Sequence, residues 1–146
     1  PMLDSFKTDE IRIRAMLGVK TLQELKINPL LCLKTENALE MDHTYSLIHD
    51  DLPAIDNEDY RRGKDTNHKV VGDATAVLAG DGLLTHAFAI LAEDENLTFE
   101  TRIVVINQIS FSSGAEEMVG GQLAEMVAES KQVILEELST NHARKT

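Results

Sequence analysis

The stretch ALEMDHTYSLIHDDLP, residues 38–53, predicts an α-helix that ends in a cluster of carboxylates. Apolar residues recur in it at alternating steps of three and four, which is the spacing of one helix face: Ala38, Met41, Tyr45, Ile48 and Leu52. We expect this helix to cover about residues 35–51. Pro53 then ends it, because proline has no backbone N–H and clashes with the preceding turn.

Apolar spacing predicts helices along most of the rest of the chain. We expect them over about residues 12–25, 73–92, 99–110, 115–129 and 135–146. The β-branched run RIVVI at residues 102–106 also suits a strand, but we interpret it as helix. We expect residues 52–72 to form a loop. The prediction is therefore an all-α chain with a single helical domain over residues 1–146.

The helix expected over residues 73–92 carries two kinds of apolar residue. Asp73 is placed to act as its N-cap. Small residues within it, among them Ala76, Ala79 and Gly80, indicate close contact with another helix. Larger side chains form the stripe that we expect to face the core: Val77, Leu84, Phe88 and Leu91.

Composition limits the partners and the setting of the chain. Lys and Arg number 14 against 25 Asp and Glu, for a net charge of −11, which argues against general affinity for nucleic acid or an anionic membrane. The longest apolar run, residues 87–92, is too short for a membrane span. The one cysteine, Cys32, excludes an internal disulfide, and between leucines we interpret it as a buried thiol rather than a nucleophile. We expect a soluble, cytoplasmic protein.

The carboxylates at the end of the first helix indicate a compensating cation. His43 and Asp50, seven residues apart, share a helix face that is distinct from the packing face. Because Pro53 breaks the helix, the chain can bring Asp56 back beside Asp50. Asp50 and Asp51 stand at a helix C-terminus, where the helix dipole disfavours negative charge. Three carboxylates gathered there need a proton or a cation.

The acidic cluster has three possible interpretations: a solvated helix end, a calcium loop and a magnesium site. A calcium loop that begins at Asp51 or Asp56 needs glycine at its sixth position, and neither loop has one. A Mg²⁺ ion held by a few carboxylates and completed by water and a substrate phosphate fits better. The solvated helix end stays as the alternative.

A basic segment follows the carboxylates directly. YRRGKDTNHK, residues 60–69, contains 4 of the 14 basic side chains: Arg61, Arg62, Lys64 and Lys69. Guanidinium groups match phosphate oxygens, and Mg²⁺ bridges carboxylates to the same oxygens, so the two segments together predict a diphosphate site. The alternative is that these bases simply neutralise nearby acids. Gly63 indicates a turn.

Several long motifs in the right order carry a family resemblance. ALEMDHTYSLIHDDLPAIDNEDYRRGKDTNHKVVGDATAVLAGDGLLTHAF, GAEEMVGGQLAEM and LEELSTNHARKT, and more weakly RIRAML, resemble the trans-isoprenyl diphosphate synthases, or polyprenyl synthetases. The resemblance implies an isoprenoid synthase fold, a helical bundle that is usually a homodimer. It implies a Mg²⁺-dependent transfer that joins isopentenyl diphosphate to an allylic diphosphate, dimethylallyl or geranyl, and gives a short-chain product such as farnesyl diphosphate.

The resemblance also assigns roles to individual residues. It makes Asp50 and Asp56 ligands of Mg²⁺, with Asp51 in the same motif. It implies that Arg61 and Lys145 bind the allylic diphosphate, and that Arg62, His43 and Arg14 bind isopentenyl diphosphate. Gln122 is expected to line the cavity wall. Each has a structural alternative. His43 fits a core histidine, Lys145 a cation at a helix end and Gln122 a packing residue.

Product length is expected to depend on two residues before the acidic motif. By resemblance, the bulk of Tyr45 and Ser46 limits how far the growing tail extends, and an aromatic residue there implies a C15 product. Helix geometry puts Ser46 about 40° from Asp50 and Tyr45 about 140° away. Tyr45 therefore reaches the pocket only through its long side chain or through a neighbouring helix, and a purely core-packing tyrosine is the alternative.

Two departures from the family pattern affect the expected activity. Ile11 stands at the position of an isopentenyl-binding lysine. The second aspartate-rich motif of the family is absent up to Thr146, so we expect the chain to be part of a longer enzyme. The alternatives are a geranylgeranyl diphosphate synthase, a catalytically silent homologue or partner subunit that binds diphosphate, and a simple metal-binding helical module. A terpene cyclase is disfavoured by the RRGK sequence after the acidic motif.

Overall fold

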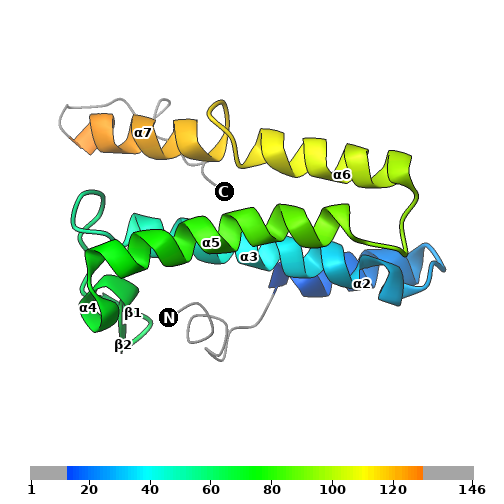
Figure 1. Ribbon diagram of the computed structural model, residues 1–146, viewed down its shortest axis with the longest axis horizontal. Helices are drawn as coiled ribbons and strands as arrows, with labels where there is room; N and C mark the ends of the chain where they lie inside the picture. Colours follow the sequence, from blue (N-terminus) through cyan, green and yellow to red (C-terminus); the bar gives the residue numbers. More distant parts are fainter. Residues whose placement is uncertain (1–12, 130–146) are drawn as a thin grey trace. The chain divides into compact units, whose positions relative to one another are not determined.

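The computed structural model describes residues 13–129, with side chains described for residues 16–128. Figure 1 shows a mainly helical chain, which confirms the predicted all-α class. The elements in chain order are α2 (Ile13–Glu24), the 3₁₀ helix η1 (Pro29–Cys32), α3 (Leu33–Asp50), β1 (Tyr60–Arg61), β2 (Lys64–Asp65), α4 (Asn67–Val71), α5 (Asp73–Ala92), α6 (Phe99–Ser112) and α7 (Met118–Glu129). The chain divides into two compact units, residues 1–102 and 103–146, with the boundary inside α6.

The core of the first unit lies between α3 and α5, which run side by side in Figure 1. From α3 and the residue after its C-cap it contains the predicted apolar face, except for Met41, which is half-buried. The buried apolar residues of the two segments are Ala38, Tyr45, Ile48 and Leu52, and Ala76, Ala79, Leu83, Ala87 and Leu91. The helix period read from the sequence therefore identified the inner face of α3 correctly.

The inner face of α5 differs from the predicted stripe of larger residues. Of that stripe only Leu91 is buried, whereas Val77 is 37% exposed and Leu84 and Phe88 are half-buried. The small residues at Ala76 and Ala79 face the core instead. The prediction of close helix contact was correct, and that contact is the physical reason why the bulkier face lies elsewhere.

One contact shows how closely the two helices approach. The His49 imidazole of α3 lies against Gly80 of α5, where a Cβ atom would collide with the ring. His49 Nε2 donates a hydrogen bond to the Val77 carbonyl at 3.0 Å.

The N-terminus of α5 was predicted slightly wrongly, because Gly72, with a φ of 83°, holds the N-cap position and Asp73 is the first helical residue.

The segment predicted as a loop contains a hairpin and a short helix. β1 pairs with β2 in antiparallel register, Tyr60 opposite Asp65 and Arg61 opposite Lys64. The turn residues Arg62 and Gly63 have positive φ values of 54° and 77°, as the type I′ turn of a two-residue hairpin requires. The expected turn at Gly63 is confirmed, but the strands were missed because two residues carry no periodic signal. α4 follows and contacts α5.

The remaining helices agree with the sequence to within a few residues. RIVVI lies inside α6, so its interpretation as helix is confirmed, and α7 begins at Met118 rather than at residue 115. The helix expected over residues 135–146 lies outside the described residues. Cys32 is half-buried rather than buried; burial raises the pKa of its thiol, which donates to the Pro29 carbonyl at 3.0 Å.

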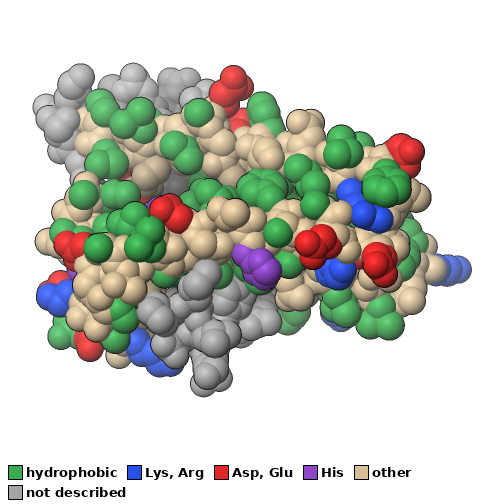
Figure 2. All heavy atoms as spheres, viewed as in Figure 1, with side chains coloured by type: hydrophobic (Ala, Val, Ile, Leu, Met, Phe, Trp, Pro, Cys, Tyr) green, Lys and Arg blue, Asp and Glu red, His purple; other side chains and the backbone are tan. Residues whose placement is uncertain are grey.

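Apolar side chains are also abundant on the surface. Figure 2 shows them spread over the visible face. In the second unit, α7 exposes a stripe with helical spacing: Val119, Leu123, Met126 and Val127. Within residues 13–129, α5 is long and apolar enough to cross a membrane by length and composition, and its buried residues pack against α3.

Candidate functional site

The site is built around the C-terminal end of α3. Asp50 is the last helical residue and Asp51 is the C-cap. After Pro53 the chain turns back, and the Asp56 amide donates to the Asp50 carbonyl at 3.0 Å, so the backbone returns as predicted. The three carboxylates differ in exposure: Asp51 is 4% exposed, Asp50 is half-buried and Asp56 is exposed.

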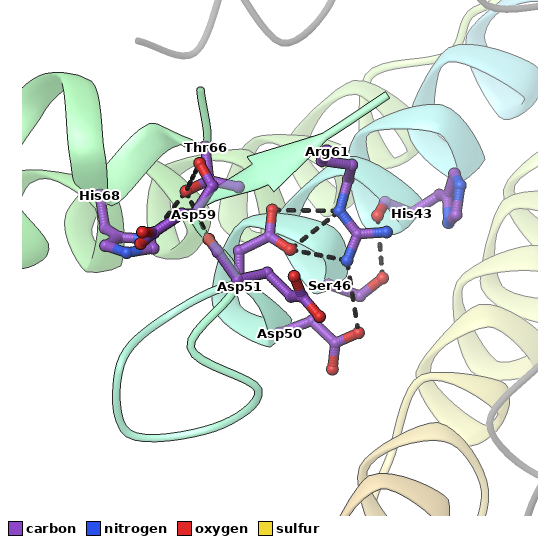
Figure 3. A network of polar contacts seen from close by, with 9 residues as sticks. His43, Ser46, Asp50, Asp51, Asp59, Arg61, Thr66 and His68 are labelled. Carbon is purple, nitrogen blue, oxygen red and sulfur yellow. Dashed lines mark hydrogen bonds and ion pairs between the residues drawn. The ribbon is translucent and has the colours of Figure 1, made fainter. Parts of the chain in front are cut away.

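A guanidinium group from the hairpin covers this acidic end. Arg61 Nε donates to the two carboxylate oxygens of Asp51 at 2.9 and 3.1 Å, and Nη2 donates to Oδ1 at 2.6 Å. Nη2 also lies 3.8 Å from an Asp50 oxygen. The hydrogen bond with Asp51 raises the pKa of Arg61, with further contributions from the charges of Asp50 and Asp56. Figure 3 shows Arg61 reaching from β1 over the end of α3.

The three carboxylates have different surroundings. Asp51 is nearly buried and both of its oxygens accept hydrogen bonds from Arg61, so it serves as the anchor of the guanidinium. Asp50 and Asp56 supply the oxygen donors that Mg²⁺ prefers. Within residues 13–129 no group of three His, Cys, Asp or Glu side chains is arranged to hold a metal ion. The donors still fit Mg²⁺, which is commonly held by one or two carboxylates and completed by water and phosphate oxygens.

Ser46 and His43 lie one and two turns before Asp50 on α3 (Figure 3). Both are half-buried, and the Ser46 hydroxyl donates to the His43 carbonyl at 2.8 Å. Tyr45 is 7% exposed in the α3–α5 core, and its ring meets His49 edge to face with centroids 5.6 Å apart. Burial raises the pKa of Tyr45 to about 12. The structure therefore places Tyr45 between the two helices.

The other predicted site residues are only partly described. Arg62 is exposed in the hairpin turn. The backbone of Arg14 belongs to α2, but its side chain lies outside the described part, as does all of Lys145. Gln122 lies in α7 of the second unit and is half-buried there.

Two buried polar residues next to the hairpin were missed by the sequence analysis. Thr66 is 3% exposed and His68 is 6% exposed, and Thr66 Oγ1 lies 3.1 Å from His68 Nδ1. The available signal was a threonine directly before a short helical stretch, which resembles an ordinary helix cap. That signal would have identified Thr66 but assigned its hydroxyl the wrong partner, because the hydroxyl makes no capping bond in the structure.

Comparison with known proteins identifies the family of the chain. The polyprenyl synthetase family model matches residues 4–146. The chain is 47% identical to the farnesyl diphosphate synthase of Bacillus subtilis over 99% of this chain and 50% of that protein. It is 50% identical to the farnesyl diphosphate synthase of Geobacillus stearothermophilus over 92% of this chain and 46% of that protein.

The same result comes from solved structures. A crystal structure of geranyltransferase from Legionella pneumophila matches with a TM-score of 0.94 and 34% identity, over 99% of this chain and 52% of that chain. The chain thus spans about half the length of the relatives it matches. It has the all-α isoprenoid synthase fold, and it belongs to the polyprenyl synthetase family.

Proposed function

We propose that the complete protein is a Mg²⁺-dependent prenyltransferase that condenses isopentenyl diphosphate with dimethylallyl or geranyl diphosphate, and that its product is farnesyl diphosphate. The observation that carries this proposal is the guanidinium of Arg61 held over the carboxylates at the end of α3. A positively charged hydrogen-bond donor beside carboxylate oxygens suits a diphosphate with its magnesium ions. Family membership supports the same reaction.

The residues of this chain would bind and stabilise the leaving group. Asp50 and Asp56 would hold Mg²⁺, which supplies positive charge to the diphosphate oxygens. Arg61 would donate to the allylic diphosphate from one edge of its guanidinium while Asp51 orients another edge. As the allylic C–O bond breaks, negative charge grows on the diphosphate, and a donor already in place stabilises it without reorganisation.

The remaining substrate contacts follow from the family pattern. We propose that His43, Arg62 and Arg14 bind isopentenyl diphosphate and that Lys145 binds the allylic diphosphate. Gln122 would line the cavity wall. The double bond of isopentenyl diphosphate attacks the allylic cation, and the released diphosphate then accepts the proton whose loss completes the condensation. Water must be excluded while the cation exists, because it would capture that cation.

Tyr45 is the proposed limit on product length, with Ser46 beside it. Its burial between α3 and α5 supports this role, because a rigid aromatic ring there can close the end of an apolar channel along the acidic helix. A smaller residue at position 45 would lengthen the product beyond C15. The alternative product is geranylgeranyl diphosphate.

We also propose an assembly and a cellular setting for the protein. Exposed apolar residues such as those of α7 are typical of surfaces that contact other polypeptide, so we propose a homodimer whose chains each form one synthase domain. The acidic composition suits a cytoplasmic enzyme. Ile11 favours one alternative function, a partner subunit that binds diphosphate without turnover.

The test is product formation by the complete protein. Purified protein is incubated with geranyl diphosphate, radiolabelled isopentenyl diphosphate and Mg²⁺, and the products are separated by chain length. We expect farnesyl diphosphate, and loss of product when the metal is chelated or when Arg61 is replaced by Ala. Diphosphate binding without any product would instead support the silent subunit.

A further inference from the structure

Thr66 occupies a capping position but does not cap its helix. It stands at the N-cap of α4, yet its side chain makes no capping hydrogen bond. Threonine at this position ordinarily accepts a hydrogen bond from an amide of the first turn. Here the hydroxyl lies 2.7 Å from the Glu58 carbonyl and 3.3 Å from the Asp59 carbonyl, both just before β1. Its hydrogen bonding is therefore directed at the base of the hairpin.

Proton counting fixes the direction of the contact with His68. A hydroxyl has one proton, and carbonyl oxygens only accept, so the Thr66 proton goes to the Glu58 or Asp59 carbonyl. The His68 Nδ1 atom, 3.1 Å from the same hydroxyl, must then be the donor. His68 belongs to α4, which contacts α5. The hydrogen bonds thus join the base of the hairpin to α4, which in turn packs against α5.

The anchored face of the hairpin is the face that presents Arg61. The Thr66 amide donates to the Asp59 carbonyl at 3.1 Å, which extends the antiparallel pairing by one position beyond Tyr60 and Asp65. Side chains of alternate residues point to the same side of a strand, so Arg61 and Thr66 share the inner face. Tyr60, 67% exposed, lies on the outer face. Figure 3 shows Thr66 and His68 beside the strand that carries Arg61.

We propose that Thr66 and His68 are positioning residues for diphosphate binding: together they fix the hairpin so that the Arg61 guanidinium stays against Asp51 and meets the allylic diphosphate. This inference rests on the proposed function of Arg61. The exposed ion pair between Lys69 and Asp59, 3.0 Å long, cannot replace this anchor, because both side chains are about half exposed and such pairs stabilise little.

Matched variants of the complete protein test the inference. Thr66→Val keeps the shape and removes the hydroxyl, whereas Thr66→Ser keeps the hydroxyl. His68→Asn places an amide donor where Nδ1 was, whereas His68→Gln places it where Nε2 was. Asp59→Asn removes the exposed ion pair and leaves the backbone carbonyl in place. Steady-state kinetics give the KM for each substrate, calorimetry gives the Kd of dimethylallyl diphosphate with Mg²⁺, and thermal unfolding checks that each variant folds.

We expect Thr66→Val and His68→Gln to raise the allylic KM and Kd about tenfold, with the KM for isopentenyl diphosphate changed less. Thr66→Ser, His68→Asn and Asp59→Asn should stay within about twofold of the wild type. In an Arg61→Ala background, Thr66→Val should add no further loss, because the two substitutions act through one group. A merely structural threonine would instead add its full loss in that background.

The outcomes separate this inference from the proposed function. Equal allylic Kd values for the wild type and Thr66→Val overturn the inference, as does a full additional loss in the Arg61→Ala background. A wild type that binds dimethylallyl diphosphate but forms no product overturns the proposed function, while the Kd values still decide the role of Thr66 and His68. A folded wild type that binds no diphosphate overturns both.

Discussion

The Arg61 guanidinium and the Asp51 carboxylate form a two-point contact, with nitrogen–oxygen distances of 2.6 to 3.1 Å, across ten residues of sequence. The contact joins the hairpin to the end of α3. It gives the second carboxylate of the acidic motif a partner within the protein, and we propose that this carboxylate orients the Arg61 guanidinium rather than binding a metal ion.

Replacing Asp51 therefore has a different effect from replacing Asp50. Asp51→Asn should raise the allylic KM by about tenfold to a hundredfold, since asparagine has no charge and only one acceptor oxygen, so the two-point contact is lost. The Mg²⁺ concentration for half-maximal activity should change less than twofold. Asp50→Asn is the control and should raise that concentration strongly. Equal shifts for the two variants would mean that Asp51 is itself a metal ligand.

Tyr45 predicts a loss of stability in alkaline solution. Its pKa is raised by burial from 10 to about 12, so the unfolded chain loses this proton at lower pH than the folded one. The associated stability is complete below pH 10 and is lost as the pH rises toward 12. It amounts to about 3 kcal/mol at most. Denaturant unfolding between pH 9 and about 12 should show a steeper fall for the wild type than for Tyr45→Phe. Substitution of the exposed Tyr60 by Phe should leave the slope unchanged.

Glu36 is a buried carboxylate that opposes folding at neutral pH. It is 8% exposed, one of its oxygens accepts no hydrogen bond, and burial, together with the charge of Glu40, raises its pKa. The folded state therefore loses stability as the pH rises through that pKa, because the buried carboxyl group becomes charged. Glu36→Gln should stabilise the protein by about 1 kcal/mol at pH 7, and the gain should vanish near pH 4. Thermal unfolding at both pH values, with the exposed Glu95→Gln as control, decides this; a gain independent of pH would contradict it.

The contact between Gly80 and His49 predicts that the effect of Gly80→Ala on stability changes sign when the His49 ring is removed. Gly80→Ala should destabilise the protein by roughly 1–3 kcal/mol, because the new methyl group meets the His49 imidazole. In a His49→Ala background the ring is gone, and alanine should then be better than glycine by about 0.5–1 kcal/mol through its helix propensity. Thermal unfolding of the four proteins gives the cycle. The same sign in both backgrounds would show that the ring does not limit the approach of α3 and α5.

The sequence predicted the long helices well because each extends over several turns of one hydrophobic period. The face of α3 through Tyr45 and Ile48 was identified from that period alone. The face of α5 was not, because the helix approaches α3 through Ala76 and Ala79, and the period of its larger residues indicated another side. Tertiary approach distance is not encoded in the spacing of apolar residues.

The candidate site, too, was predicted only in part. The break at Pro53 correctly predicted that the backbone returns from Asp50 to Asp56, because the effect of proline on the backbone is local. The pairing of Asp51 with Arg61 depends on a two-residue hairpin, too short to produce a pattern. The role of Thr66 was hidden for a related reason: its position indicates a helix cap, and only the folded chain shows where its hydroxyl points.

The most direct test of the central claim is a calorimetric titration of dimethylallyl diphosphate into the complete protein, with and without Mg²⁺, for the wild type, Asp50→Ala and Arg61→Ala. The account predicts tight binding only for the wild type with Mg²⁺, and binding at least tenfold weaker when either residue or the metal is missing. Equal affinity for all three proteins, or binding indifferent to Mg²⁺, would contradict it.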